Sequence, residues 1–202
     1  MRSSVLARWR AACGVGGATL LLAGCAVLSA GPAEAPSIYD LTAPRDIGVV
    51  RASAGQYLVP EPTAVRAIDS DRIVVRPGGG EISYLAGAQW SDRLPKLVQS
   101  RLVETLENTG KVKAVGRPGQ GLAIDWQIVT ELRAFEVDLG AGRAKVTMSV
   151  KLMNDRNGRV VATEVFFAEV PVAGDSAGAV VKGLDDASDQ VLAGAVKWVL
   201  AR

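Results

Sequence analysis

Residues 144–152 read Ala-Lys-Val-Thr-Met-Ser-Val-Lys-Leu, and every second residue of this stretch is apolar. Side chains of a β-strand point alternately to the two faces of a sheet, so this period predicts a strand with one buried face and one solvated face. The buried face would carry Ala144, Val146, Met148, Val150 and Leu152. This strand therefore indicates a sheet whose other face meets solvent.

Turn sequences flank this strand on both sides. Residues 140–143, Gly-Ala-Gly-Arg, close a hairpin before it, and Asn157-Gly158, a dipeptide that favours tight hairpin turns, leads out of it into the next strand. In the strand before the first turn, the alternation slips between Ile128 and Val129, which predicts a bulge or a strand covered on both faces. We therefore expect a meander of antiparallel strands.

Two amphipathic helices are predicted, in residues 91–110 before the meander and in residues 176–201 after it. In each, the apolar side chains share one face. The faces comprise Leu94, Leu97, Val98, Leu102 and Leu106 in the first helix, and Val180, Leu184, Val191, Ala195 and Val199 in the second. The candidate N-caps are Ser91 or Asp92 for the first helix and Asp175 or Ser176 for the second.

Short β-branched runs precede the first helix. Residues 72–76, Arg-Ile-Val-Val-Arg, and residues 81–85 flank a glycine-rich turn and predict a hairpin. Residues 38–41, 47–50 and 56–59 are further strand candidates. Together, these segments predict a single α/β domain in which two helices pack on a mixed, largely antiparallel sheet of about seven strands.

The composition limits the chemistry. The chain has no histidine, and its two cysteines, Cys13 and Cys25, both lie near the N-terminus. Without imidazole there is no Ser-His-Asp or Cys-His catalysis, and the commonest transition-metal ligand is missing. We expect no catalytic residue, no metal site and no cofactor, and thus a protein that is not an enzyme. Asp185, Asp186 and Asp189 lack an oxygen-rich loop and are expected on a solvated helix face.

The charge balance argues against nucleic acid as a partner. The whole chain has 23 Lys and Arg against 21 Asp and Glu, but Arg2, Arg8 and Arg10 lie in the first ten residues. Without residues 1–24, 20 basic side chains face 21 acidic ones, a net charge of about −1. A nearly neutral domain lacks the basic footprint of nucleic-acid-binding proteins.

Residues 1–24 have the layout of a secretory signal peptide, with a basic start, an uncharged stretch and small residues at the end. Leu22-Ala23-Gly24-Cys25 resembles the bacterial lipobox. In proteins with that motif the chain is cut between the residues that correspond to Gly24 and Cys25, the thiol takes a diacylglyceryl group, and the new amine is acylated. The alternatives are an uncleaved anchor over residues 11–30, which would be a poor membrane span, and an ordinary signal peptide cut near Ala35.

Lipidation would fix the protein to a membrane. Each buried methylene contributes about 0.8 kcal/mol, so several acyl chains hold stably. Residues 25–36 are small, include two prolines and predict a lipidated N-terminus with a flexible tether. Ala26, where an aspartate would favour the inner membrane, indicates the inner leaflet of the outer membrane in the cell envelope. The domain, residues 37–202, would face the periplasm.

The junction between the strand at 81–85 and the first helix concentrates aromatic and charged side chains. Tyr84, Trp90, Asp92 and Arg93 form a candidate surface for partner binding, because Tyr and Trp are good interface anchors. The alternative is that Tyr84 and Trp90 are core residues that fix the angle at which the helix begins.

Two other polar segments are expected to be turns. Residues 77–81 contain three glycines but lack the Gly-Lys-Ser/Thr ending of a phosphate loop and lead into a strand. Residues 69–71, Asp-Ser-Asp, lack the glycine and glutamate of a calcium loop.

The chain resembles the ABC-type transport auxiliary lipoproteins, which include the lipoproteins of paraquat-inducible and Mla-like systems. The resemblance covers roughly residues 37–200. It is carried, in order, by Tyr39-Asp40-Leu41, residues 72–76, Ile82-Ser83-Tyr84, residues 88–95, Leu97-Val98-Gln99 and Leu102. Many members of the family have a Tyr-Arg-Tyr-like segment where this chain has Ile82-Ser83-Tyr84.

The resemblance implies a non-enzymatic role beside an ABC permease, an ATPase and an MCE-domain protein. Such systems are linked to the traffic of phospholipids or other hydrophobic molecules between the inner and outer membranes. Two alternatives stay open: a periplasmic lipid-binding carrier, and a structural envelope scaffold with a fold like the N-terminal domain of TolB. An enclosed apolar cavity would favour the carrier.

The lipobox leads to a direct prediction. Replacing the acceptor thiol in Cys25→Ser removes the lipid and leaves the domain folded, so the protein should move from the membrane fraction to the soluble fraction. Membrane fractionation followed by immunoblotting checks this. A Cys25→Ser protein that stayed firmly bound to membranes would rule out lipidation as the anchor.

Overall fold

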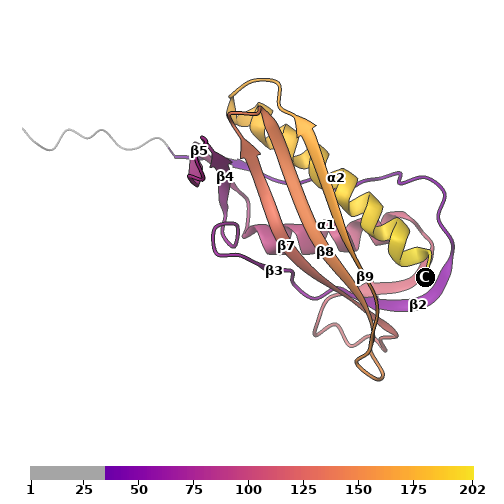
Figure 1. Cartoon of the computed structure of the whole chain (residues 1–202). Helices are drawn as coiled ribbons and strands as arrows, with labels where there is room; N and C mark the ends of the chain where they lie inside the picture. The colour runs from indigo at the N-terminus through magenta and orange to yellow at the C-terminus, as the bar shows by residue number, and fades with distance from the viewer. Residues whose placement is uncertain (1–34) are drawn as a thin grey trace, which may run out of the picture. The chain divides into compact units, whose positions relative to one another are not determined.

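Strand β7 (Trp126–Asp138) is the axis of the fold that the computed structural model shows for residues 35–202. One edge of β7 pairs antiparallel with β8 (Arg143–Asn154), and β8 pairs antiparallel with β9 (Val160–Pro171). The other edge of β7 is shared by three short strands that follow one another along it, all parallel to it. These strands are β2 (Ser53–Leu58), β3 (Thr63–Ala64) and β4 (Arg72–Arg76). Figure 1 shows the long β7–β8–β9 layer with the shorter strands beside it.

Three further strands extend the sheet from these short ones. β6 (Val112–Gly116) runs parallel to β2, β5 (Ser83–Trp90) runs antiparallel to β4, and β1 (Ser37–Tyr39) runs parallel to β5. The predicted fold class, a mixed sheet with two helices packed on it, is confirmed, and the sheet has nine strands where about seven were expected.

The strand expected at residues 47–50 is absent. Gly48 has a φ of 77°, and its N–H donates to the side chain of Asp46 over 2.7 Å, so the chain turns where a strand would have to stay extended. Ile47 is nevertheless buried, whereas Val49 is fully exposed. Conversely, the two-residue strand β3 was not predicted.

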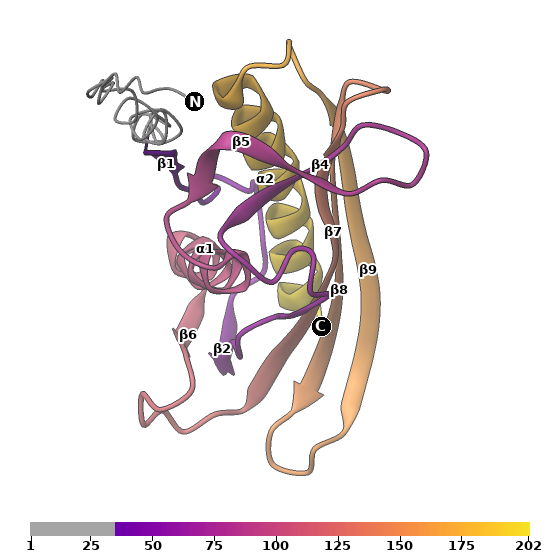
Figure 2. The same cartoon turned by 90° about the vertical axis from the view of Figure 1, so that its left-hand side faces the viewer.

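Helices α1 (Leu94–Asn108) and α2 (Ala177–Leu200) lie on the same side of the β7–β8–β9 layer, as Figure 2 shows. All ten apolar residues predicted on their inner faces are buried. Ser176 is the N-cap of α2, and its side chain accepts a hydrogen bond from the Ala179 N–H. In α1 the predicted caps are wrong: Arg93 holds the N-cap position and makes no side-chain cap bond. The backbone carbonyl of Ser70 accepts the Leu94 N–H instead.

A bulge in β7 changes which of its residues face the core. The pairing with β8 shifts between Leu132 and Ala134, so Arg133 is the extra residue. Before the bulge the even-numbered residues Ile128, Thr130 and Leu132 are buried, and after it the odd-numbered residues Phe135 and Val137 are buried. The predicted slip therefore exists, but it lies at Arg133 and not at Ile128 and Val129.

The core between the helices and the sheet is complete within residues 35–202. Its buried apolar residues run from Leu41 to Leu200. In the described part, neither helix is long and apolar enough to cross a bilayer. The predicted signal peptide, Gly24, Cys25 and the tether up to residue 34 lie outside the described residues.

Helix α2 approaches the sheet closely at Gly183. A Cβ atom there would lie 2.8 Å from Cγ2 of Val172 and 3.2 Å from Cβ of Ala144, whereas a Cβ at Gly178 would meet nothing within 4 Å. Alanine normally favours a helix over glycine by up to about 1 kcal/mol, but a forced shift in a packed interface costs about 1–3 kcal/mol.

We therefore expect Gly183→Ala to lower the free energy of unfolding, and Gly178→Ala to leave it unchanged or raise it slightly. Urea denaturation of both variants measures the difference. If Gly183→Ala matched Gly178→Ala in stability, α2 would not pack against β8 as closely as described.

Candidate functional site

The corner (residues 84–95) joins β5 to α1, and backbone hydrogen bonds to distant segments hold its shape. The Trp90 N–H donates to the carbonyl of Asp71 over 2.7 Å, and the Ser91 N–H donates to the carbonyl of Tyr39 over 2.7 Å. The turn is therefore fixed by β1 on one side and by the loop before β4 on the other.

Trp90 lies beneath this corner and not on its surface. Only 1% of its surface is exposed, and its indole packs edge-on against the ring of Phe135 with 5.9 Å between the centroids. In this structure Trp90 is a core residue that fixes where α1 begins, which was the alternative left open from the sequence. It is not available as a contact for a partner.

Tyr84 lies apart from the other predicted contact residues. It is at the start of β5, opposite Val74, whereas Trp90 is the last residue of the strand. The ring of Tyr84 is half-buried, and the guanidinium of Arg72 stacks 3.5 Å from its centroid. The structure thus groups Asp92 and Arg93, but not Tyr84, at the turn itself.

Asp92 and Arg93 are exposed and belong to a network of charges. Arg93 forms an ion pair with Glu61 at 2.9 Å and a second one with Asp69, and hydrogen bonding to Asp69 raises its pKa. Asp92 accepts a hydrogen bond from the Arg93 N–H over 2.7 Å and lies 3.8 Å from the Lys96 amine. Exposed ion pairs of this kind contribute little to stability, so changing one of these charges should leave the domain folded.

A shallow open concavity of about 470 Å³ covers the turn, and three carboxylates line it. They belong to Asp69, Asp71 and Asp92, and Arg93 lies at the same surface. Sequence reasoning placed residues 69–71 only in a turn and did not connect them to the corner. Their Asp-Ser-Asp pattern was visible, but the backbone hydrogen bonds that hold it beside the corner, from Trp90 to Asp71 and from Leu94 to Ser70, were not.

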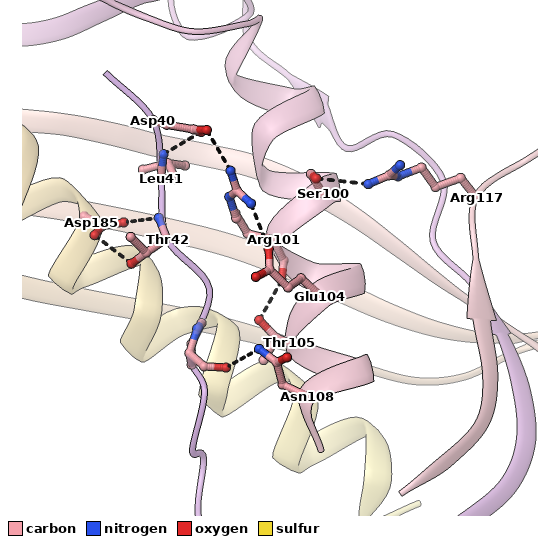
Figure 3. Close-up of polar contacts among 11 residues, drawn as sticks. Asp40, Leu41, Thr42, Ser100, Arg101, Glu104, Thr105, Asn108, Arg117 and Asp185 are labelled. Carbon is pink, nitrogen blue, oxygen red and sulfur yellow. Dashed lines mark hydrogen bonds and ion pairs between the residues drawn. The ribbon is translucent and has the colours of Figure 1, made fainter. Parts of the chain in front are cut away.

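Next to the corner, residues 40–47 cross both helices, and we call this segment the strap. The Asp40 carboxylate pairs with Arg101 of α1 at 2.8 Å, and Thr42 donates to Asp185 of α2 through its N–H at 2.7 Å and its hydroxyl at 2.8 Å. Figure 3 shows these contacts, together with the hydrogen bond from Asn108 to the strap. Leu41, between the two anchoring residues, is 2% exposed. The strap thus links the entry of the domain to both helices.

The acidic residues of α2 are not simply a solvated face. Asp186 pairs with Lys182 at 2.6 Å, as expected for an exposed helix, but Asp185 bonds the strap, and Asp189 lines a cleft beside Leu41 and Arg101. Within residues 35–202, no group of three or more Cys, Asp or Glu side chains is arranged to hold a metal ion.

Asp189 predicts a pH dependence of stability. Burial raises its pKa to about 6, the carboxylates of Asp185 and Asp186 add to the shift, and Lys182 opposes it. In the unfolded chain an aspartate titrates near about 3.9. Between these values the folded chain binds more protons than the unfolded chain, so this group makes the free energy of unfolding fall as the pH rises.

Asp189→Asn removes the buried charge. It should raise the free energy of unfolding at pH 7, and the gain should disappear near pH 4, where the native carboxyl is already protonated. Urea denaturation at both pH values checks this, with Asp186→Asn as the exposed control. An equal effect of Asp189→Asn at both pH values would contradict the pKa shift.

Comparison with known proteins relates this geometry to a family. The model of the family described as the ABC-type transport auxiliary lipoprotein component matches residues 39–195. An uncharacterized protein of Bradyrhizobium diazoefficiens is 32% identical over 148 residues, a match that takes in 72% of this chain and 40% of the relative. The chain therefore spans less than half the length of that relative.

Two solved structures share the fold. The crystal structure of a Xanthomonas campestris protein of the DUF330 family is 31% identical, with a TM-score of 0.71 over 83% of this chain and 93% of that one. A crystal structure of an uncharacterized protein, 16% identical, has a TM-score of 0.67 over 82% of this chain and 99% of that one. The match over residues 39–195 decides the family: this chain belongs to the ABC-type transport auxiliary lipoproteins.

Proposed function

We propose that this protein is the lipid-anchored auxiliary component of an MCE-type ABC transport system and that its corner binds a partner of that system. The cargo would be phospholipids or other hydrophobic molecules that move between the inner and outer membranes. Membership of the auxiliary lipoprotein family supports the role in transport. The role in docking rests on the corner.

One observation carries the docking proposal: the exposed charges of the corner lie where the chain enters the domain. β1 begins at Ser37, 12 residues after Cys25, and pairs with the last residues of β5. Twelve extended residues reach on the order of 40 Å. If Cys25 carries the lipid, the corner is held within that distance of the membrane, where a membrane-associated partner can reach it.

The proposed anchor is the diacylglyceryl and N-acyl lipid on Cys25, and the proposed site is the inner leaflet of the outer membrane. Both rest on the lipobox and on Ala26, and these residues lie outside the described part of the chain. Family membership supports a position in the cell envelope.

We infer that the protein acts by binding and not by catalysis. The absence of histidine from the whole chain supports this, because the groups that remain titrate far from neutral pH unless they are shifted. Among the residues that the structure describes, Asp189 is the one whose pKa is raised to about 6, and no serine or lysine side chain lines its cleft.

Charge reversal tests the corner. Arg93→Glu should weaken binding of the purified MCE-domain protein of the same system by about tenfold or more, because it adds a charge to a surface already rich in carboxylates. Lys151→Glu, on the exposed outer face of β8, is the matched control and should bind as the wild type does. Surface plasmon resonance measures both affinities.

A photo-crosslinking residue at Ser91 tests the same surface by contact. It should couple to the MCE-domain protein, whereas the same residue at Thr163 on β9 should not. If Arg93→Glu bound normally and the MCE-domain protein coupled at Thr163, the partner would use another face. If no form of the protein bound the MCE-domain protein, the auxiliary role proposed here would be wrong.

A further inference from the structure

A second hollow lies away from the corner, between the C-terminal end of α2 and the start of β7. It is a partly open cleft of about 340 Å³. Six of the eight residues that line it are aromatic or aliphatic, namely Tyr57, Trp126, Leu152, Val161, Ala162 and Val199. Tyr57, Leu152 and Val199 are themselves buried core residues, which means that the floor of the cleft is a rigid part of the core.

A bulge in β9 adds apolar surface to this wall. Leu152 pairs with Ala162 and Met153 pairs with Val160, so Val161 is an extra residue without a partner on β8. It lines the cleft and is 52% exposed. Bulges commonly redirect a side chain beside a binding site, and here the bulge leaves an isopropyl group at the mouth of an apolar hollow.

The cleft also has a polar end with an unused donor. The hydroxyls of Ser53 and Tyr57 are 2.8 Å apart, and the Gly55 N–H donates to the Ser53 oxygen over 3.1 Å. The two hydroxyls carry two hydrogens, and the bond between them uses one. Within residues 35–202, neither hydroxyl donates to any acceptor other than the partner hydroxyl, so one O–H remains for an acceptor on a ligand.

One cationic side chain lies at the mouth of the cleft. Among the described residues that line it, Arg202 is the only charged one, and its guanidinium lies 5.0 Å from the ring centroid of Trp198. An acceptor that also carries negative charge would satisfy both the free hydroxyl and the guanidinium.

We infer that this cleft binds one acyl chain with an anionic head, as in a fatty acid or a lysophospholipid. The apolar wall takes the chain, and the free hydroxyl with Arg202 takes the carboxylate or phosphate. The volume lies at the small end of the usual range for ligand pockets, about 300–1,000 Å³, which fits one chain and not the two of a phospholipid. This binding does not depend on the docking of a partner at the corner.

The domain of residues 35–202 is suitable for the test, because it carries its own core and because the Xanthomonas campestris crystal structure matches a region of similar extent. Trp126 is a reporter inside the cleft, whereas Trp90 is in the core and Trp198, beside Arg202, is replaced by Phe in every form used for this titration. Titration with 11-bromoundecanoate below its micelle concentration should quench the Trp126 fluorescence saturably. The Trp126→Phe domain should lose that quenching.

Chain length and head charge test the two halves of the site separately. In calorimetric titrations, affinity should rise about fourfold for each methylene from octanoate to dodecanoate, in line with the burial of apolar surface. Arg202→Glu should weaken dodecanoate binding by about tenfold. Dodecanol, which has no charge, should bind both forms alike.

Filling the cleft gives the sharpest control. Ala162 lies opposite Leu152 on the cleft side, and its neighbour Thr163 pairs with Lys151 on the outer face. Ala162→Phe should abolish dodecanoate binding, and Thr163→Phe should leave it intact. Circular dichroism and thermal melting establish whether both variants are folded. If Ala162→Phe does not fold, the Arg202→Glu titration still tests the site.

A parallel titration with myristoyl lysophosphatidylglycerol distinguishes a lysophospholipid from a fatty acid as the ligand. Binding of this lipid or of the fatty acids in a manner blocked by Ala162→Phe would support the inference and identify the head that is preferred. Three results would overturn the inference: an affinity that did not depend on chain length, equal binding of dodecanoate by Ala162→Phe and Thr163→Phe, or tighter binding of dodecyltrimethylammonium than of dodecanoate.

Discussion

The long edge of β7 is the constraint on which the rest of the structure depends. A strand with a buried face must find backbone partners along its whole length, because an unpaired buried N–H or C=O is costly. β7 has 13 residues, whereas β2, β3 and β4 have six, two and five. No one of them can cover the edge. They share it in chain order, with Tyr57 opposite Trp126, Thr63 opposite Glu131 and Val74 opposite Glu136.

This division of one edge also separates the two candidate binding regions. The first strand on the edge, β2, carries β6 and lies at the start of β7, where Tyr57 and Trp126 form the apolar cleft. The last strand, β4, carries β5 and β1 and with them the corner. Trp90 reaches back from the corner to Phe135, directly after the bulge in β7. A cleft suited to a small apolar ligand and a charged surface suited to a protein are thus parts of one sheet at different levels of its central strand.

The fold class, both helices and their inner faces could be predicted because each depends on a local period that the sequence displays. The meander strand is the clearest case: its five alternating apolar residues, such as Val146 and Val150, are all buried, and only Ser149 departs from the pattern, since it is buried although it belongs to the other face. The bulge was predicted too early in the strand because Val129 is apolar and yet only half-buried on β7. The apolar pattern therefore slips at Val129, whereas the backbone pairing shifts at Arg133. The cap of α1 failed for another reason: the carbonyl of Ser70 supplies the bond, and no local pattern shows a partner from another segment. The same limit hid Asp69 and Glu61 as partners of Arg93.

The strap lies on the path by which a force applied to the predicted tether would be transmitted to the domain. Any load at residue 35 first meets β1, which is held by β5 and by the bond from Ser91 to Tyr39. It then meets Leu41, which is buried, and the polar contacts of Asp40 and Thr42 with the two helices. Single exposed ion pairs contribute at most about 1 kcal/mol, so the backbone ladder and the buried leucine must carry most of that resistance. These elements all border the corner, and none of them lines the cleft at Trp126. In the proposed role, the lipid-anchored domain would therefore hold the corner near the membrane, while the cleft at the other end of β7 would stay accessible to the proposed ligand.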